Sequence, residues 1–301
     1  MPDESLKYFD AKTLSKLGNL DIIARLVVEG YITGLHKSPY HAFAVEFAQH
    51  REYVPGDEIK HVDWKVYARS DRYYIKQYEE ETNLRSYFLL DTSESMRYQS
   101  NGISKLEYGC YVVASLTYLL LQQQDSVGMA LFDNQIHRFI PAKSSPAHLR
   151  LILHELGQIT PQARTGMDLI FHELAERIAK RGLVVIVSDL FDDPDKILMG
   201  LRHFRHKRHE VIVFHIMDEA ELTFPFRDST MFEGLEDLGE ILTEPKSIQR
   251  AYLDEVEAHV HKLKFGCRAH SVDYVQISTA HPIDVALSAY LAGRAKRGGT
   301  V

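Results

Sequence analysis

Residues 85–91 read RSYFLLD and residues 183–189 read LVVIVSD, and these two stretches decide the fold. Each is a short, mainly apolar run that ends on an aspartate. Helical patterns alternate with such runs along the rest of the chain. Strands that are apolar on both faces and alternate with helices form a parallel sheet covered on both sides. The sequence therefore predicts a doubly wound, Rossmann-like α/β domain whose ligands bind beyond the carboxyl ends of its strands.

Apolar periodicity and turn residues predict the remaining elements. Further strands are expected at 126–132, 136–140, 210–216 and 268–275, with a small hairpin at 231–233 and 239–243. Helices are expected at 106–122, 146–157, 167–180, 194–206 and 246–265. Ahead of them, a helix at 13–28 and strands at 44–52, 61–68 and 73–79 predict a small helix-and-strand region. We therefore expect three parts: residues 1–83, an α/β domain over 84–293, and a flexible basic tail over 294–301.

Composition limits the classes of function. The chain has 301 residues, 45% of them hydrophobic and 26% charged, which is typical of a globular protein. Its net charge is −7, which argues against a protein that binds nucleic acid through a basic face. The two cysteines, Cys110 and Cys267, exclude a disulfide scaffold. The chain opens without a signal peptide, and its longest apolar run, 111–121, is too short to span a bilayer, so we expect a cytoplasmic protein with no membrane insertion.

Oxygen-bearing side chains gather on the loops where the sheet should bind its ligands. Asp91, Ser93 and Ser95 follow the first strand of the α/β domain, and Asp189 follows the strand at 183–188. Thr165 stands just before a predicted helix. Magnesium prefers oxygen ligands in an octahedral arrangement and usually keeps some waters. The sequence therefore predicts a divalent-metal site, most simply for Mg²⁺, with an open position that a carboxylate of a partner protein could fill.

This set resembles the metal-ion-dependent adhesion site of von Willebrand factor type A domains. That motif reads Asp-x-Ser-x-Ser followed by a distant Thr and a distant Asp, and all five positions have a match here. The resemblance implies a von Willebrand A-like domain. Arg164 is a departure, because such domains often carry small residues before the threonine. A guanidinium there could repel the metal or could help to receive an acidic ligand.

The N-terminal part is similar to the defining segment of a bacterial family of unknown function, number fifty-eight in the usual series. The similarity rests on four segments with the Pro-Gly-Asp, Asp-Trp-Lys and Ala-Arg strings: residues 51–57, 62–65, 68–69 and 75–81. The family carries a von Willebrand A-like domain and is typically encoded beside MoxR-type AAA+ ATPases. The resemblance implies a partnership with such an ATPase, in assembly or activation of protein complexes. It implies no established reaction.

Two other interpretations stay open. One is a metal-assisted hydrolase, in which Asp91 acts as a phosphatase nucleophile. That chemistry needs a second carboxylate two residues later as acid and base, and this chain has Ser93 there. The other is a structural scaffold, in which the loop hydroxyls only cap helices and turns. The pattern as a whole favours a non-enzymatic, metal-dependent interaction module.

Overall fold

The structure is a computed structural model of the 301-residue chain. It describes residues 19–35, 50–52, 74–76, 84–100, 102–159, 167–228, 230–233, 240–284 and 288. The chain divides into two compact units, one of residues 1–33 with 84–301 and one of residues 34–83. Each unit is described by itself.

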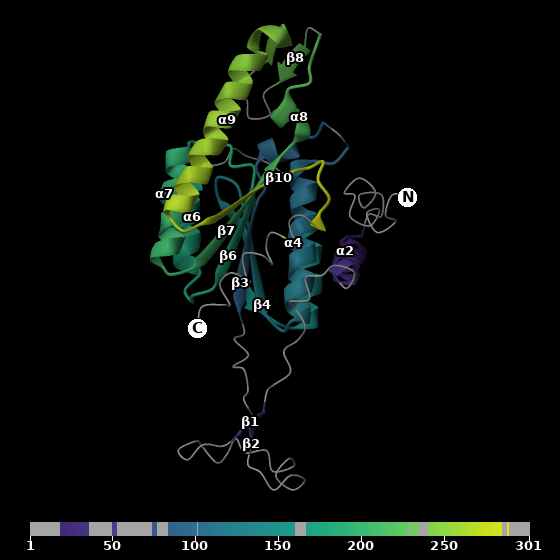
Figure 1. The fold of residues 1–301 in the computed structure, drawn as a ribbon, viewed down its shortest axis with the longest axis vertical. Coiled ribbons are helices and arrows are strands. Elements are labelled where there is room, and N and C mark those ends of the chain that lie inside the picture. The colour runs from purple at the N-terminus through teal and green to yellow at the C-terminus, as the bar shows by residue number, and fades with distance from the viewer. Residues whose placement is uncertain are drawn as a thin grey trace. The chain divides into compact units, whose positions relative to one another are not determined.

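A six-stranded sheet forms the centre of the first unit (Figure 1). Its strands are β3 (Arg85–Asp91), β4 (Ser126–Phe132), β5 (Ile136–Lys143), β6 (Leu183–Ser188), β7 (Glu210–Met217) and β10 (Asp273–Ser278). They lie in the order β10-β7-β6-β3-β4-β5, and only β5 is antiparallel to its neighbour. The order reverses at β3, so the fold is doubly wound as the sequence predicts.

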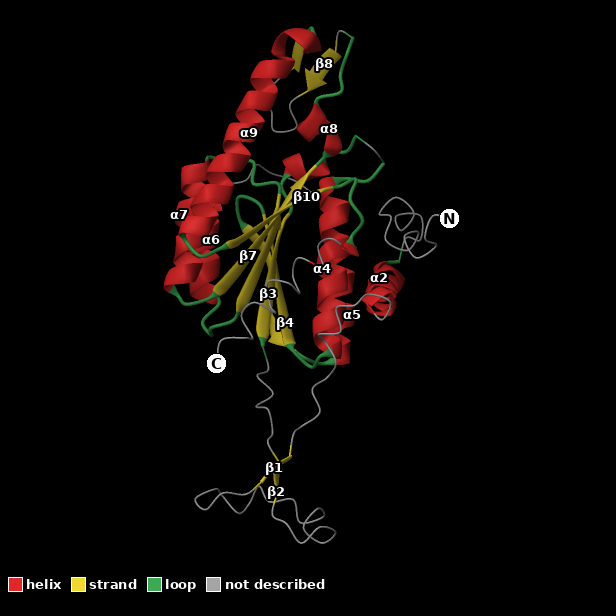
Figure 2. Ribbon diagram, in the orientation of Figure 1, coloured by secondary structure: helices red, strands yellow, loops and turns green. Residues whose placement is uncertain are grey.

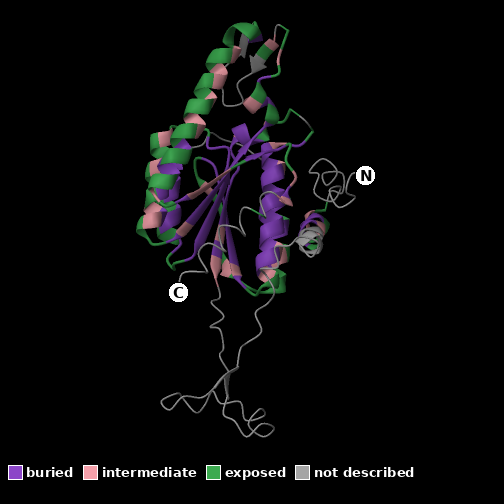
Figure 3. Ribbon diagram, viewed as in Figure 1, coloured by how far each residue is buried: buried purple, intermediate pink, exposed green. Residues whose placement is uncertain are grey.

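Helices cover both faces of the sheet (Figure 2). One face carries α4 (Lys105–Gln122), α5 (Pro146–Leu156) and α2 (Leu20–Leu35), and the other carries α6 (Met167–Arg177), α7 (Pro194–His206) and α9 (Pro245–Ala269). Alternate residues of a strand point to opposite faces. Leu90 therefore packs in the core beneath α4, whereas Leu89 packs in the core beneath α6 and α7. The central strands are buried on both sides (Figure 3), which explains their continuous apolar sequence.

Helix α2 belongs to the α/β unit, whereas the sequence assigns it to a separate N-terminal region. Its residues Ile23, Ala24, Val27 and Val28 are buried in the same core as α4 and α5. The helix also continues to Leu35, past the predicted end at residue 28. Glycines within it did not end it, because a glycine inside a helix costs only about 1 kcal/mol relative to alanine.

The second unit is described through two short strands. β1 (His50–Glu52) and β2 (Tyr74–Lys76) pair antiparallel, with Arg51 opposite Ile75. They fall within strands predicted at 44–52 and 73–79. The strand predicted at 61–68 and the tail at 294–301 lie outside the described residues.

Three elements near the C-terminus differ from their predicted limits. α8 (Glu219–Thr223) was not predicted at all. α9 runs to Ala269, four residues past its predicted end at 265, and β10 begins at Asp273 rather than at 268. Gly266 lies within α9 and is buried where a Cβ would lie 2.3 Å from the Leu198 side chain, so the close packing there favours glycine. The predicted hairpin is present as the antiparallel pair β8 (Thr230–Glu233) and β9 (Glu240–Thr243).

Candidate functional site

The candidate site lies at the carboxyl ends of β3 and β6, where the strand order reverses. Asp91 is the last residue of β3, and Asp189 follows the last residue of β6. The two strands are parallel neighbours, with Leu90 opposite Val187. Their ends therefore meet at one edge of the sheet, as the sequence predicts for a pair of aspartates placed after adjacent strands.

Asp91 is fully buried, and both of its carboxylate oxygens accept hydrogen bonds. The backbone N–H of Ser93 donates to Oδ1 at 2.9 Å, and the hydroxyl of Ser188 donates to Oδ2 at 2.6 Å. Burial and, to a lesser extent, the nearby charge of Asp189 raise the pKa of Asp91 to about 7, and these hydrogen bonds oppose that rise. A cation at this position would relieve that repulsion.

The two serines of the motif lie together on the loop that follows β3. Their hydroxyl oxygens are 3.0 Å apart, and both side chains are buried. Ser95 lies in a short 3-10 helix, Glu94–Arg97, and its hydroxyl contributes to lowering the pKa of Asp189. Asp91, Ser93, Ser95 and Asp189 are thus connected by hydrogen bonds or by direct electrostatic interaction. Thr165, the fifth predicted ligand, and the neighbouring Arg164 lie outside the described residues.

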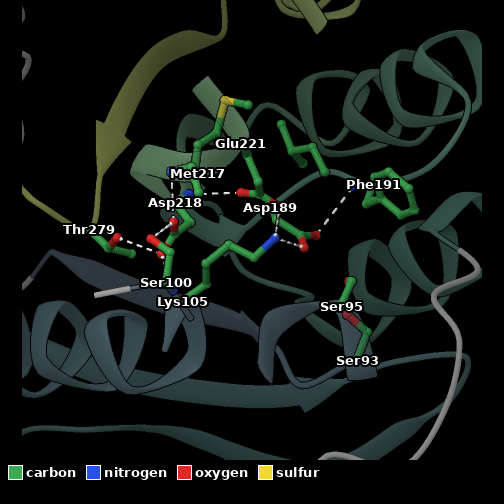
Figure 4. A network of polar contacts seen from close by, with 12 residues as sticks. Ser93, Ser95, Ser100, Lys105, Asp189, Phe191, Met217, Asp218, Glu221 and Thr279 are labelled. Carbon is green, nitrogen blue, oxygen red and sulfur yellow. Dashed lines mark hydrogen bonds and ion pairs between the residues drawn. The ribbon is translucent and has the colours of Figure 1, made fainter. Parts of the chain in front are cut away.

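A buried ammonium that the sequence did not single out completes the site. Lys105, the first residue of α4, lies between two carboxylates (Figure 4). Its Nζ is 2.8 Å from Asp189 Oδ2 and 2.6 Å from Glu221 Oε1. The Lys105 and Asp189 side chains are each 3% exposed, whereas that of Glu221 is 23% exposed.

The charges of Lys105, Asp189 and Glu221 shift one another's pKa values. Although burial disfavours both charged groups, the two carboxylates hold the pKa of Lys105 above its usual value. Likewise the pKa of Asp189 is lowered in spite of burial, because Lys105 and the Ser95 hydroxyl stabilise its charge. Burial raises the pKa of Glu221, which shares the same ammonium.

The short helix α8 holds Glu221 in place. Asp218 and Glu221 form a capping box, in which the Asp218 side chain accepts from the Ala220 N–H at 2.8 Å and the Glu221 side chain accepts from the Asp218 N–H at 2.7 Å. Asp218 also accepts hydrogen bonds from Ser100 and Thr279. The loop after β3, helix α8 and the end of β10 are thereby joined (Figure 4).

A cavity of about 350 Å³ opens on the other side of Asp189. His215 of β7 lies in its wall, fully buried, and its Nδ1 is 2.5 Å from the Tyr274 hydroxyl. Burial lowers the pKa of His215 to about 4, so its ring is neutral at pH 7. Lys105 and Asp189 line this cavity, whereas Ser93 and Ser95 do not.

The donor set fits a hard divalent ion. Within the part of the chain that the structure describes, no three His, Cys, Asp or Glu side chains group as metal ligands. An ion at this edge of the sheet would have the hydroxyls of Ser93 and Ser95 and the carboxylates of Asp91 and Asp189 beside it. Oxygen-only donors of this kind suit Mg²⁺. Because both oxygens of Asp91 already accept hydrogen bonds, this side chain suits an orienting role or a contact through water.

Comparison with protein-family models assigns the chain to a family. The model of the family described as "Protein of unknown function DUF58" matches residues 49–262. This range covers most of the chain, and the chain belongs to that family. The resemblance drawn from the N-terminal segments is therefore confirmed.

Solved structures support the fold. BatB from Bacteroides thetaiotaomicron is 15% identical and aligns with a TM-score of 0.50 over 71% of this chain and 99% of that one. The SpRpn10 VWA domain is 12% identical, with a TM-score of 0.39 over 68% of this chain and 93% of that one. The predicted doubly wound α/β fold is confirmed.

The predicted cytoplasmic location is wrong. A structure of similar fold is described as an aerotolerance-related membrane protein from Bacteroides fragilis, which is 15% identical, with a TM-score of 0.48 over 69% of this chain and 97% of that one. The prediction depended on the absence of a signal peptide and of a long apolar run, and neither observation determines where a protein resides. Among the helices that the structure describes, none combines the length and apolarity needed to cross a bilayer.

Proposed function

We propose, from membership of the DUF58 family and from the geometry of the crevice, that this protein is a non-enzymatic, metal-dependent interaction module. In this proposal Ser93 and Ser95 bind Mg²⁺ directly, and Asp91 and Asp189 bind it through water or orient the hydroxyls. Thr165 contributes the remaining side-chain ligand. The ion leaves one coordination position open, and an acidic side chain of a partner protein fills it.

The observation that carries the proposal is the pair of buried hydroxyls set between two buried carboxylates. The Ser93 and Ser95 oxygens are 3.0 Å apart, and Asp91 and Asp189 interact strongly enough for the second charge to raise the pKa of the first. Lys105 pairs with Asp189 and Glu221, but its single positive charge cannot balance both of them. A divalent cation beside the serines would compensate the remaining negative charge.

The surface around the crevice suits a protein partner. Phe191, two residues after Asp189, is 60% exposed although it is a large aromatic side chain. Exposed aromatic residues beside a polar centre are typical of interaction sites. The partner that the family resemblance implies is a MoxR-type AAA+ ATPase, and the outcome of the contact is assembly or activation of a protein complex.

The arrangement around Asp91 supports a binding role rather than catalysis. Both of its oxygens accept hydrogen bonds from Ser93 and Ser188, and position 93 carries a hydroxyl where a phosphatase of this type needs a second carboxylate. We therefore expect no turnover in a phosphatase and esterase panel with Mg²⁺ or Mn²⁺. Turnover that Asp91→Asn abolishes would instead establish the hydrolase.

Capture of a purified MoxR-type AAA+ ATPase tests the proposal. Wild type, the double variant Ser93→Ala/Ser95→Ala, and Asp91→Ala are compared with and without EDTA. Glu173→Ala is the matched control, because Glu173 is exposed on α6, away from the crevice. We expect capture by wild type and the control in Mg²⁺, and loss in EDTA and in both crevice variants. Capture that survives chelation and Asp91→Ala would refute the metal bridge.

A further inference from the structure

The cavity beside the crevice combines apolar walls with an excess of negative charge. Its volume of about 350 Å³ falls in the range of roughly 300–1,000 Å³ that is usual for ligand pockets. Apolar surface comes from Phe191, Met217 and Val256, together with the ring of Tyr252. The wall also carries four carboxylates, against a single ammonium. These groups are Asp189, Asp192, Glu221, Glu255 and Lys105.

One face of α9 forms a large part of the wall. Tyr252, Glu255, Val256 and His259 are spaced as i, i+3, i+4 and i+7, so they lie on the same side of the helix.

The wall is held by contacts to the neighbouring loops. His259 Nε2 lies 3.1 Å from the carbonyl oxygen of Leu190, and the Tyr252 ring lies 4.8 Å from that of Phe224. These contacts tie α9 to the loop after β6 and to the end of α8. The cavity is therefore formed without a ligand, which lowers the ordering cost of binding.

The charges in the wall select the ligand. Lys105 is buried and already paired with Asp189 and Glu221, so it offers little attraction to an incoming anion (Figure 4). Asp192 is partly exposed and Glu255 is exposed, and both add negative charge at the cavity. An anion would be repelled, whereas a cation with an apolar stem would match both the charge and the surface.

Arginine matches this chemistry best. Its guanidinium stacks on aromatic rings and binds carboxylates in a bidentate manner, while its methylene stem packs on apolar surface. We propose that the cavity receives an arginine side chain of a partner protein, with the stem against Met217 and Val256 and the guanidinium between the aromatic rings and Glu255. This site shares Asp189 with the serine crevice but does not require the metal.

The test uses the full chain in EDTA, with N-acetyl-arginine amide as the probe and N-acetyl-citrulline amide as the uncharged control of similar shape. Methyl NMR follows Met217 and Val256, and the exposed methyls of Met199 and Met231 report nonspecific binding. We expect saturable millimolar binding of the arginine probe that shifts the cavity methyls. The citrulline probe should bind at least fivefold more weakly.

Variants of α9 complete the test. Glu255→Gln should weaken binding roughly two- to fivefold, as for a single exposed ion pair. Glu257→Gln, which alters an exposed carboxylate of the same helix outside the cavity wall, should leave binding unchanged. Equal binding of both probes, equal effects of the two variants, or shifts centred on Met199 and Met231 would each overturn the inference. Because the titration is run without metal, its failure is distinguishable from failure of the metal bridge.

Discussion

Replacing Lys105 by methionine should destabilise the protein more than any exposed lysine replacement. Methionine keeps most of the side-chain volume but removes the ammonium that lies 2.8 Å from Asp189 and 2.6 Å from Glu221. Asp189 would then be a carboxylate at 3% exposure without its cation, beside the second buried carboxylate of Asp91. Glu221 is 23% exposed and can be partly hydrated.

The magnitude follows from this burial. Removing one partner of a buried ion pair costs about 3–5 kcal/mol, because it leaves an uncompensated charge in the interior. We expect Lys105→Met to lower the free energy of unfolding by about that amount, which is a large fraction of the roughly 5–15 kcal/mol of a typical domain. Lys207→Met is the control: its ammonium lies 2.8 Å from Glu176, but both side chains are about half exposed, and no measurable change is expected.

Urea unfolding followed by circular dichroism in EDTA measures both variants. A double-mutant cycle then separates the charge effect from packing. Asp189→Asn removes the carboxylate that Lys105→Met leaves unpaired, so the double variant should be more stable than the sum of the single losses predicts. The argument from the buried charge would be refuted if Lys105→Met lowered the free energy of unfolding by less than about 1 kcal/mol. It would also be refuted if the effects of the two single variants simply added in the double variant.

Two further predictions concern stability. The pKa of Asp91 is about 7 in the folded protein, against an unperturbed value of 3.8, so the folded state holds this proton more tightly than the unfolded state does. The resulting contribution of Asp91 to the free energy of unfolding is fully present below pH 4 and is lost as the pH rises through 7. In EDTA, wild type should therefore lose more stability than Asp91→Asn between pH 5 and pH 8; equal losses in urea midpoints would contradict this. Gly182→Ala should cost about 1–3 kcal/mol, because its Cβ would lie 2.3 Å from the carbonyl oxygen of Arg85. Gly157→Ala, with its nearest neighbours at 3.5 Å, should be tolerated, and similar melting temperatures for the two variants would show that the contact at Gly182 relaxes freely.

The α/β sheet was predictable because burial on both faces removes ambiguity from its strands. β6 is buried along its whole length, and its sequence, LVVIVS, is continuous in β-branched and apolar residues. The relation between Asp91 and Asp189 followed from topology alone, since parallel strands end at the same edge. Neither inference needed a measured distance.

The ion pair was missed because its partners lie far apart in the sequence. Lys105, Asp189 and Glu221 are separated by 84 and 116 residues along the chain, measured from the lysine. One local signal was present: Ser104 caps α4, so Lys105 begins a helix where the macrodipole disfavours a cation. A lysine in that position suggests nearby carboxylates, although it does not identify them.

The sequence did not predict helix α8 or the end of helix α9. α8 has five residues, which is too short for a periodic pattern, although Asp218 and Glu221 have the spacing of a capping box. The end of α9 was placed four residues too early. Gly266, just beyond the predicted end, is a point of close helix packing against Leu198, and only the tertiary structure reveals that role.

The charges of the site give the proposed metal a definite role in partner choice. Without a divalent ion, an acidic side chain approaching Ser93 and Ser95 would meet the negative charge around Asp91 and Asp189, because Lys105 divides its single positive charge between Asp189 and Glu221. With the ion bound, the same approach would become attractive. The metal would thus change the sign of the interaction rather than add to an existing attraction. An interface built in this way would form only with the metal-loaded protein, so partner capture should depend steeply on Mg²⁺, whereas occupation of the neighbouring cavity should not.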